Sequence, residues 1–283
     1  MKTGLVLEGG GLRGLFTTGI LDAMLDEGVT VDGMIGVSAG ALFGCNYKSR
    51  QKGRALRYNV MLKDNTDYMG WRTFFKTGEI VSNEFSYHIV PFEIDKVDCE
   101  TFKENPMEFW MVATDIERGT AVFHQMKEVN HYELDWMRAS ASMPVVSKPV
   151  CLDGKKMLDG GIINSIPLKD FQQMGYERNI VILTQPLGYF KKPTKLRWLF
   201  NMKYRKTFPK VAEMMAHRHE MYNAQLRYLM EQEKLGNTLL IYPEKPLGIG
   251  RTELNETKMR AVHSHGYNLG RTMMPKIKAF LQQ

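Results

Sequence analysis

Long apolar segments are missing from this 283-residue sequence. No stretch approaches the roughly 20 consecutive apolar residues that a membrane-spanning helix needs. The apolar run at residues 3–7 is too short for the core of a secretory signal peptide, and Glu8 ends it, so we interpret it as a buried strand. The sequence therefore predicts a cytoplasmic protein, whose contact with a membrane would be peripheral.

Cysteine is scarce, with three residues in the chain, Cys45, Cys99 and Cys151. An odd number at wide spacing argues against a disulfide framework. Without a CxxC pair, the sequence gives no indication of a structural zinc site. We expect each cysteine to be a small buried thiol.

Neither charge nor hydrophobicity is extreme. Hydrophobic residues make up 43% of the chain and charged residues 24%, which excludes disordered and collagen-like classes. The net charge of +7 favours anionic partners, but it does not choose among nucleic acid, anionic lipid and acidic small molecules.

Strand-like and helical patterns alternate through the first half of the chain. Residues 3–8 and 33–37 have the short apolar runs of buried strands, and residues 15–26 carry apolar side chains at helical spacing. Strands that alternate with helices favour a mostly parallel sheet covered by helices on both faces, which is the α/β class. No linker or repeat divides the chain, so we predict one α/β domain over residues 1–283. Within it we expect a helical or irregular insertion at about 51–106 and a helical C-terminal extension at about 188–283.

The segment Gly36-Val37-Ser38-Ala39-Gly40 lies between a predicted strand and a predicted helix. A nucleophilic serine needs this setting, because a sharp strand-to-helix turn points its hydroxyl outward and flanking glycines remove side chains that would clash. The helix N-terminus also places the positive end of its dipole beside a developing oxyanion. Composition alone gives roughly 0.07 chance matches to GxSxG in this chain. We therefore interpret Ser38 as a nucleophile, with Gly36 and Gly40 as its supporting glycines.

A glycine-rich turn at residues 9–14 also lies between a predicted strand and a predicted helix. Backbone N–H groups in such a turn can hold an anion at the helix N-terminus. If that anion is the oxyanion of a tetrahedral intermediate, the donors are expected at Gly10, Gly11 and Arg13.

The same turn permits a second interpretation, because Gly9, Gly11 and Gly14 satisfy the GxGxxG pattern that binds the pyrophosphate of a dinucleotide. That site needs an acidic residue at the carboxyl end of the following strand. Asp32 precedes that strand and Ser38 follows it. The pattern weakens the hypothesis of a dinucleotide-binding oxidoreductase without removing it.

Asp159, Gly160 and Gly161 follow a predicted hairpin whose turn is Asp153-Gly154. A carboxylate between a strand end and two glycines can be approached closely by another loop, which suits a base that accepts the Ser38 proton. None of the seven histidines lies in a recognisable catalytic motif, and we interpret the closely spaced pairs on predicted helices as solvated or capping residues.

Together, the glycine-rich turn, the Ser38 motif and the Asp159 motif, in this order, resemble the patatin-like phospholipase family. The resemblance covers about residues 3–185. It implies a three-layer α/β/α fold with a mostly parallel central sheet and a Ser38–Asp159 catalytic dyad. It also implies a phospholipid or other acyl-ester substrate and neither a metal nor an organic cofactor.

Residues 188–210 contain eight Lys or Arg, six aromatic residues and no acidic residue. This composition suits an anionic membrane surface, with aromatic rings at headgroup depth and cations on the lipid. A solvated connector is the competing interpretation. No recognised nucleic-acid-binding fold accompanies the segment, so we do not expect nucleic acid as a partner. The basic stretch between Lys48 and Arg57 is interpreted in the same way.

The sequence thus predicts a serine lipid acyl hydrolase, a phospholipase or esterase, that works through an acyl-enzyme. Two alternatives from other classes stay open: the dinucleotide-binding oxidoreductase, and a non-catalytic module that binds lipid or membrane.

Overall fold

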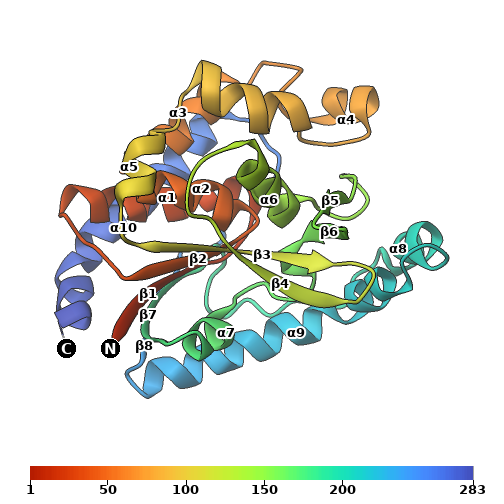
Figure 1. Ribbon diagram of the computed structural model, residues 1–283. Coiled ribbons are helices and arrows are strands. Elements are labelled where there is room, and N and C mark those ends of the chain that lie inside the picture. Colours follow the sequence, from red (N-terminus) through yellow and green to blue (C-terminus); the bar gives the residue numbers. More distant parts are fainter. Residues whose placement is uncertain (283) are drawn as a thin grey trace.

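The computed structural model, which describes residues 1–282, has a single mixed sheet of eight strands between two layers of helices (Figure 1). The three-layer α/β/α fold is as predicted. The strands are β1 (Lys2–Leu7), β2 (Gly33–Val37), β3 (Glu108–Asp115), β4 (Thr120–Gln125), β5 (Val150–Leu152), β6 (Lys155–Asp159), β7 (Tyr176–Ile182) and β8 (Thr238–Ile241).

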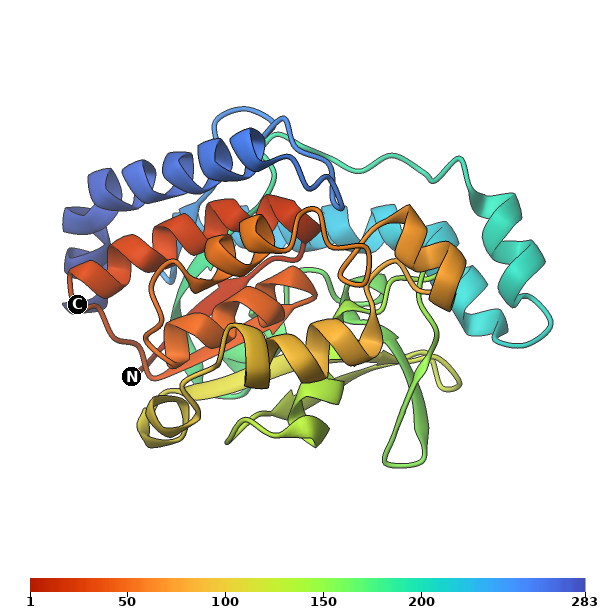
Figure 2. The ribbon, with the colours of Figure 1, turned by 90° about the horizontal axis from the view of Figure 1, so that it is seen from above.

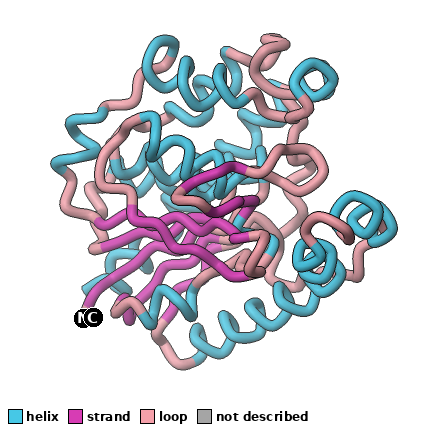
Figure 3. Tube along the Cα trace, turned by 45° about the vertical axis from the view of Figure 1, so that its right-hand side comes forward, coloured by secondary structure: helices cyan, strands magenta, loops and turns pink. Residues whose placement is uncertain are grey.

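The helices on one face of the sheet include α1 (Leu15–Asp26), α2 (Ala39–Lys48), α6 (His131–Ala141) and α10 (Glu256–Gln282). On the other face lie α7 (Leu168–Gln173) and α9 (Pro209–Lys234). Figure 2 shows α10, in dark blue, running beside α1. Figure 3 shows the strands enclosed between the two helical layers.

Five strands are parallel, in the order β3, β2, β1, β7 and β8. The remaining strands add antiparallel pairs at one side, since β4 and β6 both pair with β3, and β5 pairs with β6. The β5–β6 pair is the hairpin predicted around Asp153-Gly154. Because parallel strands end at the same edge, the loops after β1, β2 and β7 are brought together there.

Successive side chains of β1 point to opposite faces of the sheet and pack into the two hydrophobic cores on either side of it. Leu5 and Leu7 pack into the core under α1, α2 and α10, whereas Val6 packs into the core under α7 and α9. All three are fully buried. Each such side chain contributes about 1.5–3 kcal/mol through burial, so the sheet that carries the site loops is rigid.

The segment at 51–106 packs over the helical layer of α1, α2, α6 and α10, and contains α3 (Arg54–Met61), α4 (Trp71–Thr77), a π-helical stretch η2 (Phe85–Ile94) and α5 (Cys99–Glu104). The segment after residue 188 contributes α8 (Arg197–Tyr204), α9, β8 and α10. No helix in the described part of the chain is long and apolar enough to cross a membrane.

Two expectations about single side chains were wrong. The basic stretch between Lys48 and Arg57 is only partly an exposed cationic face. Arg50, Lys52 and Arg57 are exposed, but Arg54 is buried against Asp95, and the Lys48 ammonium donates to the carbonyl of Asn105 at 2.8 Å. Lys48 and Arg54 interact with groups inside the protein, and sequence spacing does not reveal these partners.

The cysteines also differ from expectation. Cys45 is a buried thiol, whose pKa burial raises to about 11, but Cys99 is half-buried and Cys151 is exposed. Cys151 lies in β5 at the edge of the sheet, where alternate residues face solvent.

Candidate active site

Ser38 occupies a sharp turn between β2 and α2. Its backbone has φ 55° and ψ −125°, outside the regions that side-chain-bearing residues ordinarily adopt. The turn is fixed by hydrogen bonds: the Ser38 N–H donates to Ser140 Oγ at 3.0 Å, and its carbonyl accepts from the N–H of Leu42 at 3.0 Å. Strain of this kind persists where the surrounding structure enforces it, and it concentrates at functional sites.

The glycines on either side of Ser38 are required by close packing. A Cβ at Gly40 would lie 2.3 Å from the Leu7 carbonyl oxygen, and one at Gly36 would lie 2.5 Å from the Ala41 nitrogen. Both neighbours are backbone atoms that cannot rotate away. The GxSxG spacing thus lets α2 start directly against the end of β1, with Ser38 at the surface of the turn.

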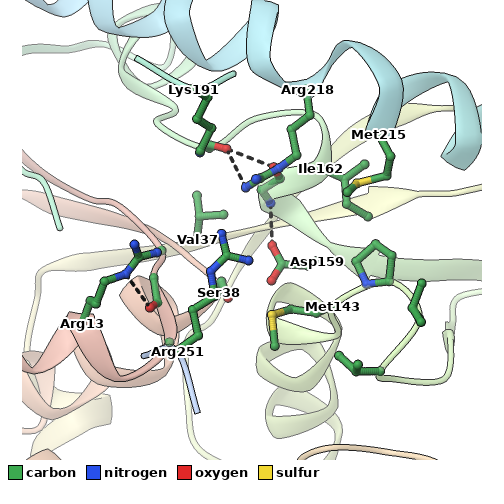
Figure 4. A pocket seen from close by; sticks show the side chains of 18 of the residues that line it. Arg13, Val37, Ser38, Met143, Asp159, Ile162, Lys191, Met215, Arg218 and Arg251 are labelled. Carbon is green, nitrogen blue, oxygen red and sulfur yellow. Dashed lines mark hydrogen bonds between the residues drawn. The ribbon is translucent and has the colours of Figure 1, made fainter. Parts of the chain in front are cut away.

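Asp159 ends β6 and lies beside Ser38 at the same edge of the sheet (Figure 4). One carboxylate oxygen accepts the N–H of Gly161 at 2.7 Å, and the Asp159 N–H donates to the Ser142 carbonyl at 2.8 Å. A Cβ at Gly160 would lie 2.2 Å from the Val112 carbonyl oxygen. The two glycines therefore allow the chain to fold back on β3 while an N–H group is turned towards the carboxylate.

The pKa of Asp159 is raised above its ordinary value because the carboxylate is buried. Interaction with the Ser38 side chain, the Gly161 N–H and the positive charges of Arg218 and Arg251 opposes this rise but does not cancel it. A carboxylate with a raised pKa is a stronger base than a solvated one. Asp159 thus gains the basicity that an exposed aspartate lacks.

The glycine-rich turn lies against Ser38 and is continued by the short helix η1 (Gly11–Gly14). A Cβ at Gly9 would be 2.9 Å from the Ser38 Cβ, so the turn approaches the serine closely. The N–H of Leu12 donates to the Arg251 carbonyl at 2.9 Å and is unavailable to a ligand.

The Arg251 backbone also covers Gly11, where a Cβ would lie 2.3 Å from that carbonyl oxygen. In the dinucleotide interpretation this glycine turn must let a pyrophosphate approach closely. The loop before α10 occupies that side, and β2 is followed by Ser38 instead of an acidic residue.

Ser38, Asp159 and the glycine-rich turn line one cavity of about 400 Å³. Its other walls come from the loop before β5, including Met143 and Val145, and from segments after residue 184. Lys191, Arg218 and Arg251 also line it. Lys191 belongs to the basic segment 188–210, but no motif marked any of the three as a cavity residue. They reach the site from the loop after β7, from α9 and from the loop before α10.

A second, smaller cavity of about 130 Å³ lies on the other side of Ser38, under the 51–106 segment. Its walls are mostly apolar and aromatic, with Leu42, Tyr58, Pro91 and Met137 among them. Ser38, Gly11, Met143 and Arg251 border both cavities. The serine therefore stands at the junction of two chemically different spaces.

The histidines lie elsewhere. Within residues 1–282 no histidine lines either cavity. His263 is half-buried against Asp22 at 2.8 Å, where the sequence led us to expect a solvated or capping residue, whereas His217 is exposed and pairs with Glu220. In the described chain, no three His, Cys, Asp or Glu side chains are grouped as metal ligands. Asp159 is therefore the base candidate nearest Ser38.

Comparison with known families gives two matches. The model of the patatin-like phospholipases matches residues 5–171, which include Ser38, Asp159 and the glycine-rich turn. A domain of unknown function, DUF6363, matches residues 208–282, which include Arg218 and Arg251.

Among curated relatives, the lysophospholipase nte1 of Aspergillus oryzae is 28% identical over 184 residues, which are 62% of this chain and 11% of that protein. The uncharacterized protein YjjU of Escherichia coli is 25% identical over 256 residues, which are 87% of this chain and 70% of that protein. Among solved structures, VipD from Legionella pneumophila aligns with a TM-score of 0.48 and 13% identity, covering 97% of this chain and 67% of that one.

Proposed function

From the premise that this chain belongs to the patatin-like phospholipase family, we propose that it is a serine hydrolase that cleaves fatty-acyl esters of lipids through an acyl-enzyme. One observation carries the proposal: Ser38, on a strained strand-to-helix turn, shares a cavity with Asp159, a buried carboxylate whose pKa is raised. The lysophospholipase name of the Aspergillus relative points to the same substrate class.

In the proposed reaction the Ser38 Oγ attacks the ester carbonyl carbon while its proton moves to Asp159. The tetrahedral intermediate collapses, the bond to the alcohol oxygen breaks, and that oxygen takes the proton from Asp159. Water then gives its proton to Asp159 and attacks the acyl-enzyme. Collapse of the second intermediate returns the proton to Ser38 and releases the fatty acid.

The oxyanion is proposed to bind to backbone N–H groups of Gly10, Gly11 and Arg13. The turn that carries them packs directly on Ser38, and Leu12 is excluded because the Arg251 carbonyl takes its N–H. Removing one such donor typically costs about 3–4 kcal/mol of transition-state stabilisation.

We also propose that the mouth of the cavity rests on an anionic membrane. Two helices project at the same end of the molecule, α4 and α8 (Figures 1 and 2). Each exposes large apolar side chains: Trp71 (64%) and Phe75 (83%) on α4, Trp198 (62%) and Met202 (71%) on α8. Trp71 also lines the cavity. The exposed cations at 188–210, which do not include Lys191, would each add about 1 kcal/mol of attraction to an anionic surface.

Hydrolysis of p-nitrophenyl esters of graded chain length tests the proposal, with wild type beside Ser38→Ala and Asp159→Asn. We expect turnover in the wild type and its loss in both folded variants. Vesicle binding without any ester or phospholipid turnover in the wild type would favour the non-catalytic lipid-binding module instead.

A further inference from the structure

Four basic side chains converge on the larger cavity beside Ser38 and Asp159. Arg13 comes from η1, Lys191 from the loop after β7, Arg218 from α9 and Arg251 from the loop before α10. Figure 4 shows Arg218 and Arg251 reaching towards the cavity from opposite sides of the Ser38–Asp159 pair. The carboxylates that line the same cavity are Glu8 and Asp159.

These basic side chains have no close carboxylate partner in the part of the chain that the structure describes. Within residues 1–282 none of the four forms an ion pair. Glu8 and Asp159 supply the negative charge that acts on them, and Glu8 also accepts the N–H of Thr184 at 2.7 Å and the hydroxyl of Tyr222 at 2.8 Å. Arg13, Lys191 and Arg218 are half-buried and Arg251 is exposed, and repulsion between like charges opposes such a cluster.

The cations affect one another directly. Burial and the nearby charge of Arg251 lower the pKa of both Arg13 and Arg218. Burial and the charge of Arg218 lower the pKa of Lys191 to about 6, and its ammonium nitrogen lies 3.1 Å from the centre of the Tyr222 ring. An anion placed among them would offset the charge of the three arginines and favour protonation of Lys191.

The donors needed for such an anion are free. The Arg13 Nε donates to the Gly10 carbonyl at 3.2 Å, no hydrogen bond of its terminal nitrogens is found within residues 1–282, and the residue lines the cavity. The exposed Arg251 side chain has no hydrogen-bond partner in the described part of the chain. By contrast, Arg218 is held by the Gly161 carbonyl at 2.5 Å and by Ser165 at 3.3 Å.

We propose that this cluster, the cation site, binds the phosphate of an anionic headgroup, so that the preferred substrate is an acyl ester of a phosphorylated alcohol. The inference rests on the proposed function. An ester whose carbonyl carbon lies at Ser38 has an apolar acyl chain on one side and an alcohol on the other. The two cavities that meet at Ser38 match these two parts, because one is mostly apolar and the other is lined by basic side chains. The acyl chain enters the apolar cavity of about 130 Å³, and the phosphorylated alcohol lies in the cationic cavity of about 400 Å³.

The cation site also gives a role to the C-terminal part of the chain. Arg218 and Arg251 lie within residues 208–282, which match the domain of unknown function, whereas Ser38 and Asp159 lie within the patatin-like match. We infer that residues 208–282 supply recognition of the alcohol side, and that the patatin-like part supplies the acyl transfer.

The test compares two water-soluble esters that differ only by the phosphate, 1-hexanoylglycerol 3-phosphate and 1-hexanoylglycerol. Short chains keep both substrates monomeric, so a charged membrane surface cannot contribute. We expect the wild type to prefer the phosphorylated ester in kcat/KM by roughly tenfold or more, because hydrogen bonds to charged groups contribute this much. Arg251→Gln and Lys191→Met should each reduce that ratio by roughly tenfold. Lys245→Gln, an exposed cation in the same loop as Arg251, should keep it.

Calorimetry with glycerol 3-phosphate separates this inference from the proposed function, because it needs no turnover. Binding to the wild type that is lost in Arg251→Gln supports the cation site even if neither ester is hydrolysed. Hydrolysis of both esters at equal rates, with no binding of glycerol 3-phosphate, would overturn the site and leave the hydrolase intact. Binding of inorganic phosphate without any substrate preference would also overturn it, because the site would then hold free phosphate and not a headgroup.

Discussion

Replacing Gly40 by alanine tests whether the packing of the Ser38 turn is as tight as the structure indicates. The new Cβ would lie 2.3 Å from the Leu7 carbonyl oxygen, whereas ordinary contacts begin at 3.4 Å. The start of α2 must therefore move away from β1 by about 1 Å. Overpacking of this kind costs about 1–3 kcal/mol of folding free energy.

Ser38 immediately precedes α2, so the same movement displaces its hydroxyl. A displacement of about 1 Å at a reacting group costs roughly 100-fold in rate. Urea unfolding gives the stability change, and kcat/KM for p-nitrophenyl butyrate gives the activity change. Gly188→Ala is the matched control, because no atom lies within 4 Å of its Cβ position. If Gly40→Ala unfolds at the wild-type urea concentration and keeps full activity, the tight turn described here is wrong.

Four further predictions concern buried polar groups and the helices that are proposed to contact the membrane. Tyr222→Phe removes a hydrogen bond to the buried carboxylate of Glu8 and should lower the free energy of unfolding by about 1–3 kcal/mol, measured by urea denaturation; an unchanged midpoint would show that Glu8 does not depend on this bond. Asp159 must be ionised to accept a proton, and burial raises its pKa, so the acidic limb of the kcat/KM profile should lie above pH 3.8; a limb at or below that pH would contradict the assignment. The folded protein holds the Lys191 proton less tightly than the unfolded chain, since its pKa falls from 10.5 to about 6, so Lys191→Met should stabilise the protein at pH 7 and lose this advantage as the pH rises towards 10.5. The groups that face Lys191 are Glu8, Arg13, Arg218, Tyr222 and Arg251, and a constant difference in stability from pH 7 to 10 would exclude the shift. The double variant Trp198→Ser and Met202→Ser should weaken sedimentation with phosphatidylglycerol vesicles while leaving hydrolysis of soluble esters unchanged; equal sedimentation would remove α8 from the membrane surface.

Much of the fold could be predicted from the sequence because its signals are local. The apolar run of β1, the helical spacing of α1 and the Asp153-Gly154 turn each depend on residues that are neighbours in the chain. The α/β class and the mostly parallel sheet follow from their alternation. The pairing of β6 with β3 was not predicted, because it depends on contacts between residues that are far apart in the chain and leave no periodic pattern.

The residues of the candidate site differ in the same way: some have a local signal in the sequence and others have none. Ser38 and Asp159 are signalled by glycines, because backbone crowding at Gly40 and Gly160 permits no side chain. Arg218 and Arg251 carry no such mark. An arginine on a long helix or in a loop looks like any solvated cation until the fold turns it into a cavity. The same reasoning explains why Arg54 was misjudged: its partner Asp95 lies 41 residues away in the sequence.

The most direct measurement is the hydrolysis of p-nitrophenyl butyrate by wild type, Ser38→Ala and Asp159→Asn, each shown to be folded by its unfolding transition. Loss of the base should cost on the order of 100- to 10,000-fold in kcat, and loss of the nucleophile should abolish acyl-enzyme formation in mass spectrometry. Asp159→Asn should fold at least as stably as wild type at pH 7, because an ionised carboxylate with a raised pKa is penalised in the folded state and the amide carries no charge. Turnover that disappears in both folded variants is the predicted result. Wild-type turnover in Ser38→Ala would contradict the proposed mechanism at its centre.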